Sequence, residues 1–194
     1  MENSRMLATI LCAILLTPEV ASFPTGAPLN ACMTLYPSSH GASTATGPSP
    51  YSLTFSSSTY RPGETIEVTL SGAQFKGFLI VGRKQIDTTK SNVGHFQTPA
   101  TKDAKLLCTG LQEGNGVTHT NNTVKSSITF DWKAPAADIG DIVFHFTIVR
   151  GGAPSTQSDP SDYYMDLTSA PLKSASKATK TAHGFQAKLR MWLF

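Results

Sequence analysis

The sequence predicts an all-β protein, an antiparallel β-sandwich of about seven to nine strands. Three observations lead to this fold class. Apolar and polar residues alternate with a period of two in successive segments from residue 51 onward. Clusters of turn-forming residues separate those segments. Helical periodicity is absent between the N-terminal apolar run and the C-terminal tail, so the pattern favours strands joined by short turns.

The first two strands are predicted at residues 51–57 and 65–71, where alternate positions are aromatic or aliphatic. Pro62 and Gly63 lie between them. Proline favours the second position of a β-turn, and glycine favours the third position when a positive φ is needed there. The two strands are therefore expected to be joined by a tight turn.

Further strands follow with the same alternation, except that segment 77–83 is apolar at nearly every position. A strand of that kind is expected to be covered on both faces. The polar stretch 114–126 is interpreted as an exposed loop that contains His119, whereas His145 is interpreted as a hydrogen-bonded histidine within a strand. The remaining strands are predicted at 93–98, 105–110, 126–132, 141–149 and 162–168.

Segment 1–22 has the features of a secretory signal peptide. Arg5 precedes an apolar run at 6–16, a proline follows the run, and small residues end the segment. An N-terminal membrane anchor is the alternative, but the run is shorter than the roughly 20 residues that a spanning helix needs. We therefore expect cleavage after Ser22 and a secreted, extracellular protein.

The cysteines follow from this expectation. The chain has three of them, and Cys12 belongs to the segment that is expected to be removed. Cys32 and Cys108 remain. In an oxidising secretory route an isolated pair most simply forms a disulfide, and two unpaired thiols are the alternative. With the disulfide formed, the Pro- and Gly-rich segment 23–31 is expected to run extended over the sandwich.

Charge is distributed unevenly along the chain. The net charge is +3, but residues 23–169 carry ten basic and eleven acidic side chains, and the tail at 170–194 carries five basic and no acidic ones. A near-neutral body does not suggest a nucleic-acid partner. The tail is predicted to be basic and mostly flexible. Its last segment, 183–194, is basic and aromatic. Fraying or contact with the body is the favoured interpretation, and peripheral contact with an anionic membrane is the alternative.

None of the readily recognised enzyme motifs is present, whether nucleophile elbow, phosphate-binding loop or zinc-protease helix. The two nearest histidines, His95 and His119, are 24 positions apart, whereas metal sites usually place paired ligands about two to five apart. We therefore expect no enzymatic activity, no cofactor and no metal ion. A small secreted enzyme that uses His95, His119 or His145 is the alternative.

One modification site is readable. Asn121 begins the triplet Asn-Asn-Thr, which is an acceptor for N-linked glycosylation. Its polar surroundings suit a solvent-facing loop. The protein is therefore expected to be a glycoprotein, and an unused acceptor triplet is the alternative.

Several segments, in order, resemble the reeler (reelin) domain over residues 23–169, and the arrangement of the whole chain is similar to that of the secreted, noduler-like insect defence proteins. The tail after Thr168 has no counterpart in the family pattern. The segments that carry the resemblance are "FPTGAPLNAC" (23–32), "GPSPYSLTFSSSTYRPGETIEVTLSG" (47–72), "FKGFLIVGR" (75–83), "LLC" (106–108), "VTHTNNTVKSSITFDWKAP" (117–135) and "DYYMDLT" (162–168).

The resemblance implies an Ig-like β-sandwich, an extracellular location and a defence response in innate immunity. It also implies binding of microbial surface components such as lipopolysaccharide, with antimicrobial (antibiotic) or haemocyte-aggregating action. The alternative is an extracellular adhesion or matrix module that binds cells or glycosaminoglycan. Basic side chains would attract anionic headgroups, so the candidate ligand-binding residues are Lys188, Arg190 and Trp192 in the tail and Lys76, Arg83 and Lys84 around the third strand.

Overall fold

The structure is a computed structural model. It describes residues 23–37, 43–45, 47–87, 89–108, 114–150 and 161–176. The expected signal peptide at 1–22 and the candidate residues Lys188, Arg190 and Trp192 lie outside these ranges.

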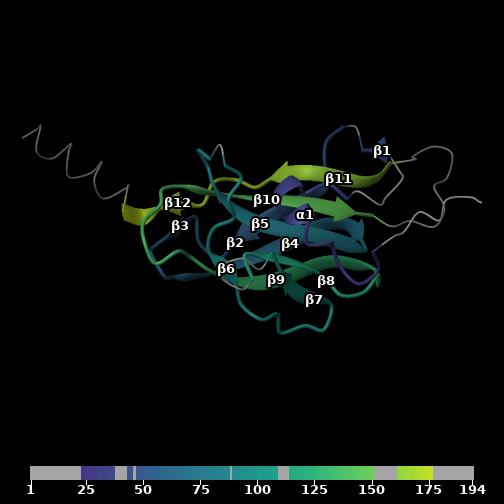
Figure 1. Ribbon diagram of the computed structural model, residues 1–194, viewed down its shortest axis with the longest axis horizontal. Helices are drawn as coiled ribbons and strands as arrows, with labels where there is room; N and C mark the ends of the chain where they lie inside the picture. Colours follow the sequence, from purple (N-terminus) through teal and green to yellow (C-terminus); the bar gives the residue numbers. More distant parts are fainter. Residues whose placement is uncertain are drawn as a thin grey trace, which may run out of the picture.

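Two β-sheets lie against each other in the described part of the chain (Figure 1). The larger sheet has six strands in the order β1-β11-β10-β5-β8-β7. Its pairs are antiparallel except for the short parallel pair of β1 with β11. The bounds are Ser43–Thr44 for β1, Gly77–Lys84 for β5, Ala104–Leu107 for β7, Gly116–His119 for β8, Ile142–Val149 for β10 and Ser161–Thr168 for β11.

The smaller sheet has four antiparallel strands in the order β2-β4-β9-β6. A separate short parallel pair joins β12 to β3. The bounds are Tyr51–Phe55 for β2, Thr59–Tyr60 for β3, Thr65–Phe75 for β4, His95–Phe96 for β6, Lys125–Lys133 for β9 and Lys173–Ser174 for β12. The chain is therefore nearly all β, which confirms the predicted fold class.

A single aromatic-rich core lies between the two sheets. Phe78 of β5 contacts Phe130 of β9 with ring centroids 5.5 Å apart. Trp132 of β9 meets Phe144 of β10 at 5.1 Å with nearly perpendicular rings. The first contact is tilted and the second is edge-to-face, and both add to the large apolar area that each ring buries. They join the sheets into a sandwich.

The predicted turn and the strand with two covered faces are both present. Gly63 has a φ of +75°, and the backbone amide of Glu64 donates to the Arg61 carbonyl at 3.0 Å to close the turn. In β5, Phe78 and Ile80 belong to the core between the sheets. Leu79 and Val81 point to the opposite face and are equally buried.

The segment from 114 to 126 differs from the prediction of an exposed loop. Residues 116–119 form β8, and all four are buried. Val117 packs in the core, and the Thr118 hydroxyl donates to the Phe78 carbonyl at 2.7 Å. The polar residues mask this strand in the sequence because their hydrogen bonds are satisfied inside the protein. The two-residue strands β1, β3 and β12 are too short for alternation to reveal them.

The packed chain continues beyond residue 169, where the sequence predicted the tail to begin. Leu172 is fully buried and exchanges two backbone hydrogen bonds with Ile142. Lys173 and Ser174 then pair with β3. The expected boundary falls short because the residues that follow it show no apolar alternation, although one buried leucine, Leu172, fixes them to the body.

Gly94 supports the core by leaving room for an aromatic ring. Its φ is +64°, and a Cβ at this position would lie 2.2 Å from Cζ2 of Trp132. Gly63 has a similar φ of +75° but open space around it. The two glycines therefore share the backbone constraint, and Gly94 alone carries the packing constraint.

We predict that Gly94→Ala lowers the free energy of unfolding by about 2–4 kcal/mol, because a left-handed φ and an overpacked core both add cost. Gly63→Ala should cost only about 1 kcal/mol, from the backbone alone. Urea denaturation of the two variants measures the difference. Equal losses would contradict the packing role of Gly94.

Candidate functional site

Residues 23–37, which we call the strap, cross the outer face of the six-stranded sheet. The strap contains α1, the four-residue helix Ala31–Thr34, and Figure 1 shows α1 against β5 and β10. Ala31, Cys32 and Leu35 pack on the outer side chains of β5 in a second apolar cluster. The strap thus buries the face of β5 that points away from the main core.

The start of the strap is hydrogen bonded to β8. The amide of Ala27 donates to the Thr118 hydroxyl at 3.0 Å. The His119 Nδ1 accepts from the Phe78 amide at 3.1 Å, so its Nε2 carries the proton that is donated to the Phe23 carbonyl at 3.0 Å. His119 was expected in an exposed loop, but it is a buried histidine that fastens the strap.

A disulfide fastens the middle of the strap. Cys32 in α1 is bonded to Cys108, just after β7, with the two Cα atoms 5.5 Å apart and a sequence separation of 76. Both cysteines are 7% exposed. The bond links the first described segment of the chain to the edge of the six-stranded sheet.

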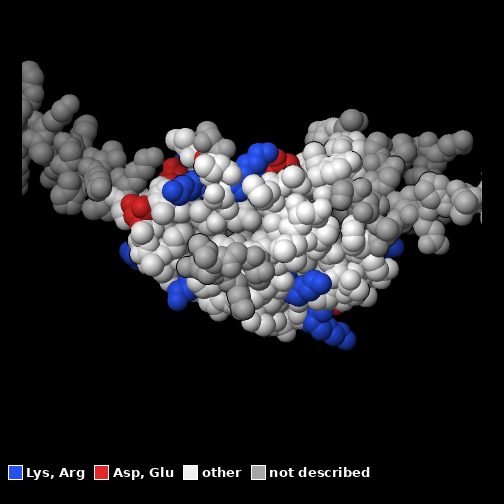
Figure 2. Space-filling view, viewed as in Figure 1, with Lys and Arg blue, Asp and Glu red and all other residues white. Residues whose placement is uncertain are grey.

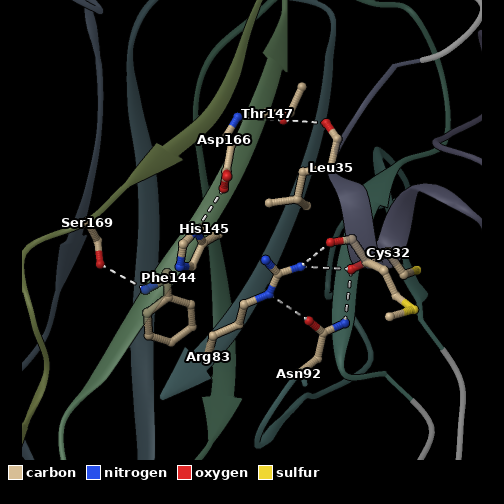
Figure 3. Close-up of polar contacts among 10 residues, drawn as sticks. Cys32, Leu35, Arg83, Asn92, Phe144, His145, Thr147, Asp166 and Ser169 are labelled. Carbon is tan, nitrogen blue, oxygen red and sulfur yellow. Dashed lines mark hydrogen bonds and ion pairs between the residues drawn. The ribbon is translucent and has the colours of Figure 1, made fainter. Parts of the chain in front are cut away.

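Arg83 of β5 is hydrogen bonded to the same helix from the side of the sheet (Figure 3). One guanidinium nitrogen donates to the carbonyls of Cys32 and Met33 at 3.2 and 2.9 Å, and Nε donates to Asn92 Oδ1 at 3.2 Å. Helix C-terminal carbonyls lack partners within the helix, and a basic side chain satisfies them. Burial lowers the pKa of Arg83, and the charges of Asp166 and Asp87 oppose that change.

This position argues against the prediction that Arg83 binds ligand. The side chain is 4% exposed, and its bonded nitrogens donate to two strap carbonyls and to Asn92. The physical reason is strand alternation, because Arg83 shares a face of β5 with Leu79 and Val81. Arg83 is therefore a structural residue.

The end of the strap is fastened to β10. The Thr147 hydroxyl donates to the Leu35 carbonyl at 2.8 Å and accepts from the Asp166 amide at 3.1 Å. Asp166 Oδ1 lies 2.7 Å from Nδ1 of His145. His145 is thus a sheet histidine with a partner, as the sequence predicted. Figure 3 shows these contacts beside those of Arg83.

A groove of about 720 Å³ lies beside α1 and the disulfide, and we call it the strap groove. Its floor and walls are mainly apolar or uncharged, and Leu29 and Met33 remain 58% and 62% exposed. Two lysines and no carboxylate occur among its described lining residues. These residues are Leu29, Cys32, Met33, Lys84, Thr89, Lys90, Ser91, Asn92, Val93, Gly94, Cys108, Asn115, Pro135 and Ile139.

A local turn positions Lys90 at this groove. Asp87 accepts hydrogen bonds from the Thr89 amide and hydroxyl at 2.8 and 2.6 Å and from the Ser91 amide at 2.9 Å. The Thr89 bonds are the main cause that lowers the pKa of Asp87, and Lys84 adds a smaller contribution. The Asp87 carboxylate therefore points into the loop. Lys90 follows with a backbone φ of +55°, and its side chain is exposed.

A second groove of about 400 Å³ adjoins the first and shares Lys84 and Ile139 with it. Ile86 lines this second groove and is 93% exposed. Asp141 is the one carboxylate among its described lining residues. It forms an ion pair with Lys173 at 3.1 Å. Figure 2 shows the face seen in Figure 1, on which charged side chains are few and lie mainly towards the margin.

The structure separates the three candidate lysines and arginines that it describes. Lys84 is exposed and lines both grooves. Lys76 precedes β5 at its other end, about 25 Å away for an eight-residue strand. Sequence reasoning missed Lys90, Leu29 and Met33. The turn around Asp87 could have indicated Lys90, but nothing in the sequence places the strap beside that turn.

Asn121 follows β8 and is half-buried rather than fully exposed. Its Nδ2 donates to Asp103 Oδ1 at 2.7 Å, and its Oδ1 accepts from the Thr123 amide at 3.1 Å and from the Thr123 hydroxyl. Lys125 donates to the Thr123 carbonyl at 2.8 Å. Burial lowers the pKa of Lys125, and Asp103 opposes that change. The acceptor triplet is thus held by local hydrogen bonds.

Across the described ranges, no group of three or more histidine, cysteine or acidic side chains is arranged to hold a metal ion. No helix among the described residues is long and apolar enough to cross a membrane.

Comparison with known proteins relates the chain to one family. The profile of the Reeler domain matches residues 30–179. "Putative defense protein 3" of Antheraea mylitta is 33% identical over 149 residues, which cover 75% of this chain and 87% of that protein. "Putative defense protein 1" of the same organism is 31% identical over 175 residues, covering 87% and 96%. Ferric-chelate reductase 1 of Mus musculus is 33% identical over 151 residues, which are 77% of this chain but only 25% of the reductase.

Solved structures with the same fold include two of F-spondin. The human F-spondin reeler domain gives a TM-score of 0.54 at 21% identity, covering 70% of this chain and 95% of that one. The Reelin-N domain of F-spondin gives 0.52 at 22% identity, covering 69% and 91%. At these identities the likeness shows the fold.

We predict that Arg83→Met lowers the free energy of unfolding by about 1–3 kcal/mol, because the carbonyls of α1 lose a charged donor. Lys84→Met is the matched control, since it makes the same kind of change at the neighbouring exposed position, and it should stay within about 0.5 kcal/mol of the parent protein. Urea denaturation measures both. An Arg83→Met protein as stable as its control would contradict the fastening role.

Proposed function

Because the chain belongs to the reeler domain family, and relatives that it matches over most of their length are named as defense proteins, we propose that it is a secreted innate-immune defence protein. We propose further that it binds anionic microbial surface components, such as lipopolysaccharide, through the strap groove. The action is recognition without turnover. The match to ferric-chelate reductase covers a quarter of that protein and does not support an enzymatic role.

The composition of the strap groove carries this proposal. Lys84 and Lys90 flank an otherwise uncharged and largely apolar hollow that has no carboxylate among its described lining residues. Lipopolysaccharide combines phosphate groups, sugars and acyl chains in one molecule. Exposed ammonium groups attract the phosphates, and the apolar lining suits the lipid. A heavily sulfated glycosaminoglycan would call for a longer row of cations than these two lysines.

Processing completes the proposal. We infer that residues 1–22 are removed during secretion, that Asn121 carries a glycan, and that Lys188, Arg190 and Trp192 add contacts with anionic surfaces. A glycan on Asn121 would replace one amide hydrogen, and the other could still donate to Asp103. Antibacterial and haemocyte-aggregating actions would follow from attachment to microbial surfaces.

The test compares two double variants of the secreted protein on lipopolysaccharide-coated beads. Lys84→Gln/Lys90→Gln should weaken binding by about tenfold or more, because two cations near an anionic surface are lost. Lys102→Gln/Lys133→Gln removes two exposed lysines that line neither groove and should bind like the parent protein. Added salt should weaken the binding of the parent protein to the beads, because salt screens the attraction between charges. Equal binding by both variants would refute the assignment of this groove.

A further inference from the structure

The two adjoining grooves carry more exposed apolar surface than a phosphate or a sugar needs. Leu29, Met33 and Ile86 are 58%, 62% and 93% exposed. A single exposed apolar side chain is common on a soluble protein. Here three of them line two adjoining grooves that share Lys84 and Ile139, and exposed apolar side chains gathered in one region usually mark a contact site.

Met33 is held in place by the anchoring of its helix. Met33 lies on α1, whose carbonyls receive the Arg83 guanidinium, and Cys32 in the same helix is bonded to Cys108. The anchored helix cannot turn Met33 towards the sheet without breaking those bonds. The fold therefore keeps the apolar side chain of Met33 exposed at the groove, although leaving such a side chain in water is unfavourable.

Charge narrows the identity of the partner. Lys84 and Lys90 flank the apolar residues, and no ion pair is found for either of them among the described residues. Lysine side chains can extend along an apolar surface and keep the ammonium group at the level of lipid headgroups. Exposed apolar side chains bordered by cations form the pattern that binds the interface of an anionic membrane.

A protein partner fits this composition less well. Protein interfaces are enriched in aromatic residues, methionine and arginine and depleted in lysine. The described lining of the two grooves contains three lysines, one carboxylate that pairs with Lys173, and uncharged side chains. Met33 is its one residue of a type enriched in protein interfaces, and no aromatic residue or arginine occurs among the described lining residues.

We propose that Leu29, Met33 and Ile86 insert into the interface of an anionic phospholipid bilayer while Lys84 and Lys90 contact its headgroups. We call these five residues the docking surface. The proposal rests on the proposed recognition of microbial surfaces and deepens it, because it adds the lipid phase as a binding partner. The disulfide and Arg83 would keep the surface rigid during insertion.

Sedimentation with vesicles tests the apolar part of the surface. The secreted protein should bind vesicles of phosphatidylglycerol mixed with phosphatidylcholine and should bind phosphatidylcholine alone far more weakly. Leu29→Ser/Met33→Ser should weaken binding to the anionic vesicles by about tenfold or more, since two inserted side chains are lost. Val124→Ser is the matched control, because Val124 is 56% exposed and lines neither groove. It should bind like the parent protein.

Fluorescence separates insertion from electrostatic attachment. Met33→Trp, made in a Trp192→Phe background, places a reporter on the docking surface, and its emission should shift to shorter wavelength only when anionic vesicles are added. Val124→Trp in the same background should not shift. Thermal unfolding of each variant checks that it is folded, and the substituted side chains are exposed, so the fold should be retained.

Each result has one consequence. A parent protein that binds lipopolysaccharide but not anionic vesicles would overturn the insertion proposal and leave the proposed function standing. Binding to vesicles with no loss in Leu29→Ser/Met33→Ser and no shift in Met33→Trp would also overturn insertion. A parent protein that binds neither ligand would refute the proposed function itself. If the docking surface bound a protein and not the anionic vesicles, the assignment to a membrane would be overturned.

Discussion

The attachment of the strap to the outer face of β5 is the constraint on which the rest of this structure depends. A four-residue helix has no stability of its own in water. The Cys32–Cys108 disulfide joins residues separated by 76 positions. Closing a loop of that size lowers the entropy of the unfolded chain and so stabilises the folded protein by up to about 4.5 kcal/mol. The Arg83 guanidinium then satisfies the helix carbonyls that no backbone group can reach.

This attachment gives the two sheets different outer faces. The four-stranded sheet presents polar side chains to solvent from β2, β4 and β9, as the alternating burial of those strands shows. The six-stranded sheet is covered by the strap, so β5 is buried on both faces. The strap brings Leu29 and Met33 beside Lys84 and Lys90, which lie more than fifty positions later in the chain. A rigid support and an exposed amphipathic surface therefore arise from the same contacts.

Most of the sheet could be predicted from the sequence because alternation is a local property. The turn at Gly63 and the doubly covered β5 followed from residue type and spacing alone. β8 was missed because Thr118 and His119 are polar, and only the fold supplies their buried partners. The end of the body was placed too early because a single leucine, Leu172, holds it.

The candidate site was harder to predict because it is made by contacts between distant segments. Arg83 and Lys84 are adjacent cations in the sequence, yet the first is buried under the strap and the second lines the groove. Alternation along β5 could have separated them, but only once the strap was known to cover Leu79 and Val81. Leu29 and Met33 gave no signal, because an exposed apolar residue in a loop resembles any other until its neighbours are known.

Hydrogen–deuterium exchange on the secreted protein, with and without anionic vesicles, tests the central claim that the fastened strap presents the recognition surface. Without vesicles, the amides of Ala27 and Leu35 should exchange slowly, because each is hydrogen bonded in the strap. With vesicles, residues 29–34 and 84–94 should gain protection, and the four-stranded sheet should not change. A strap that exchanges at the rate of an unfolded chain, or protection that appears on the four-stranded sheet instead, would contradict the account.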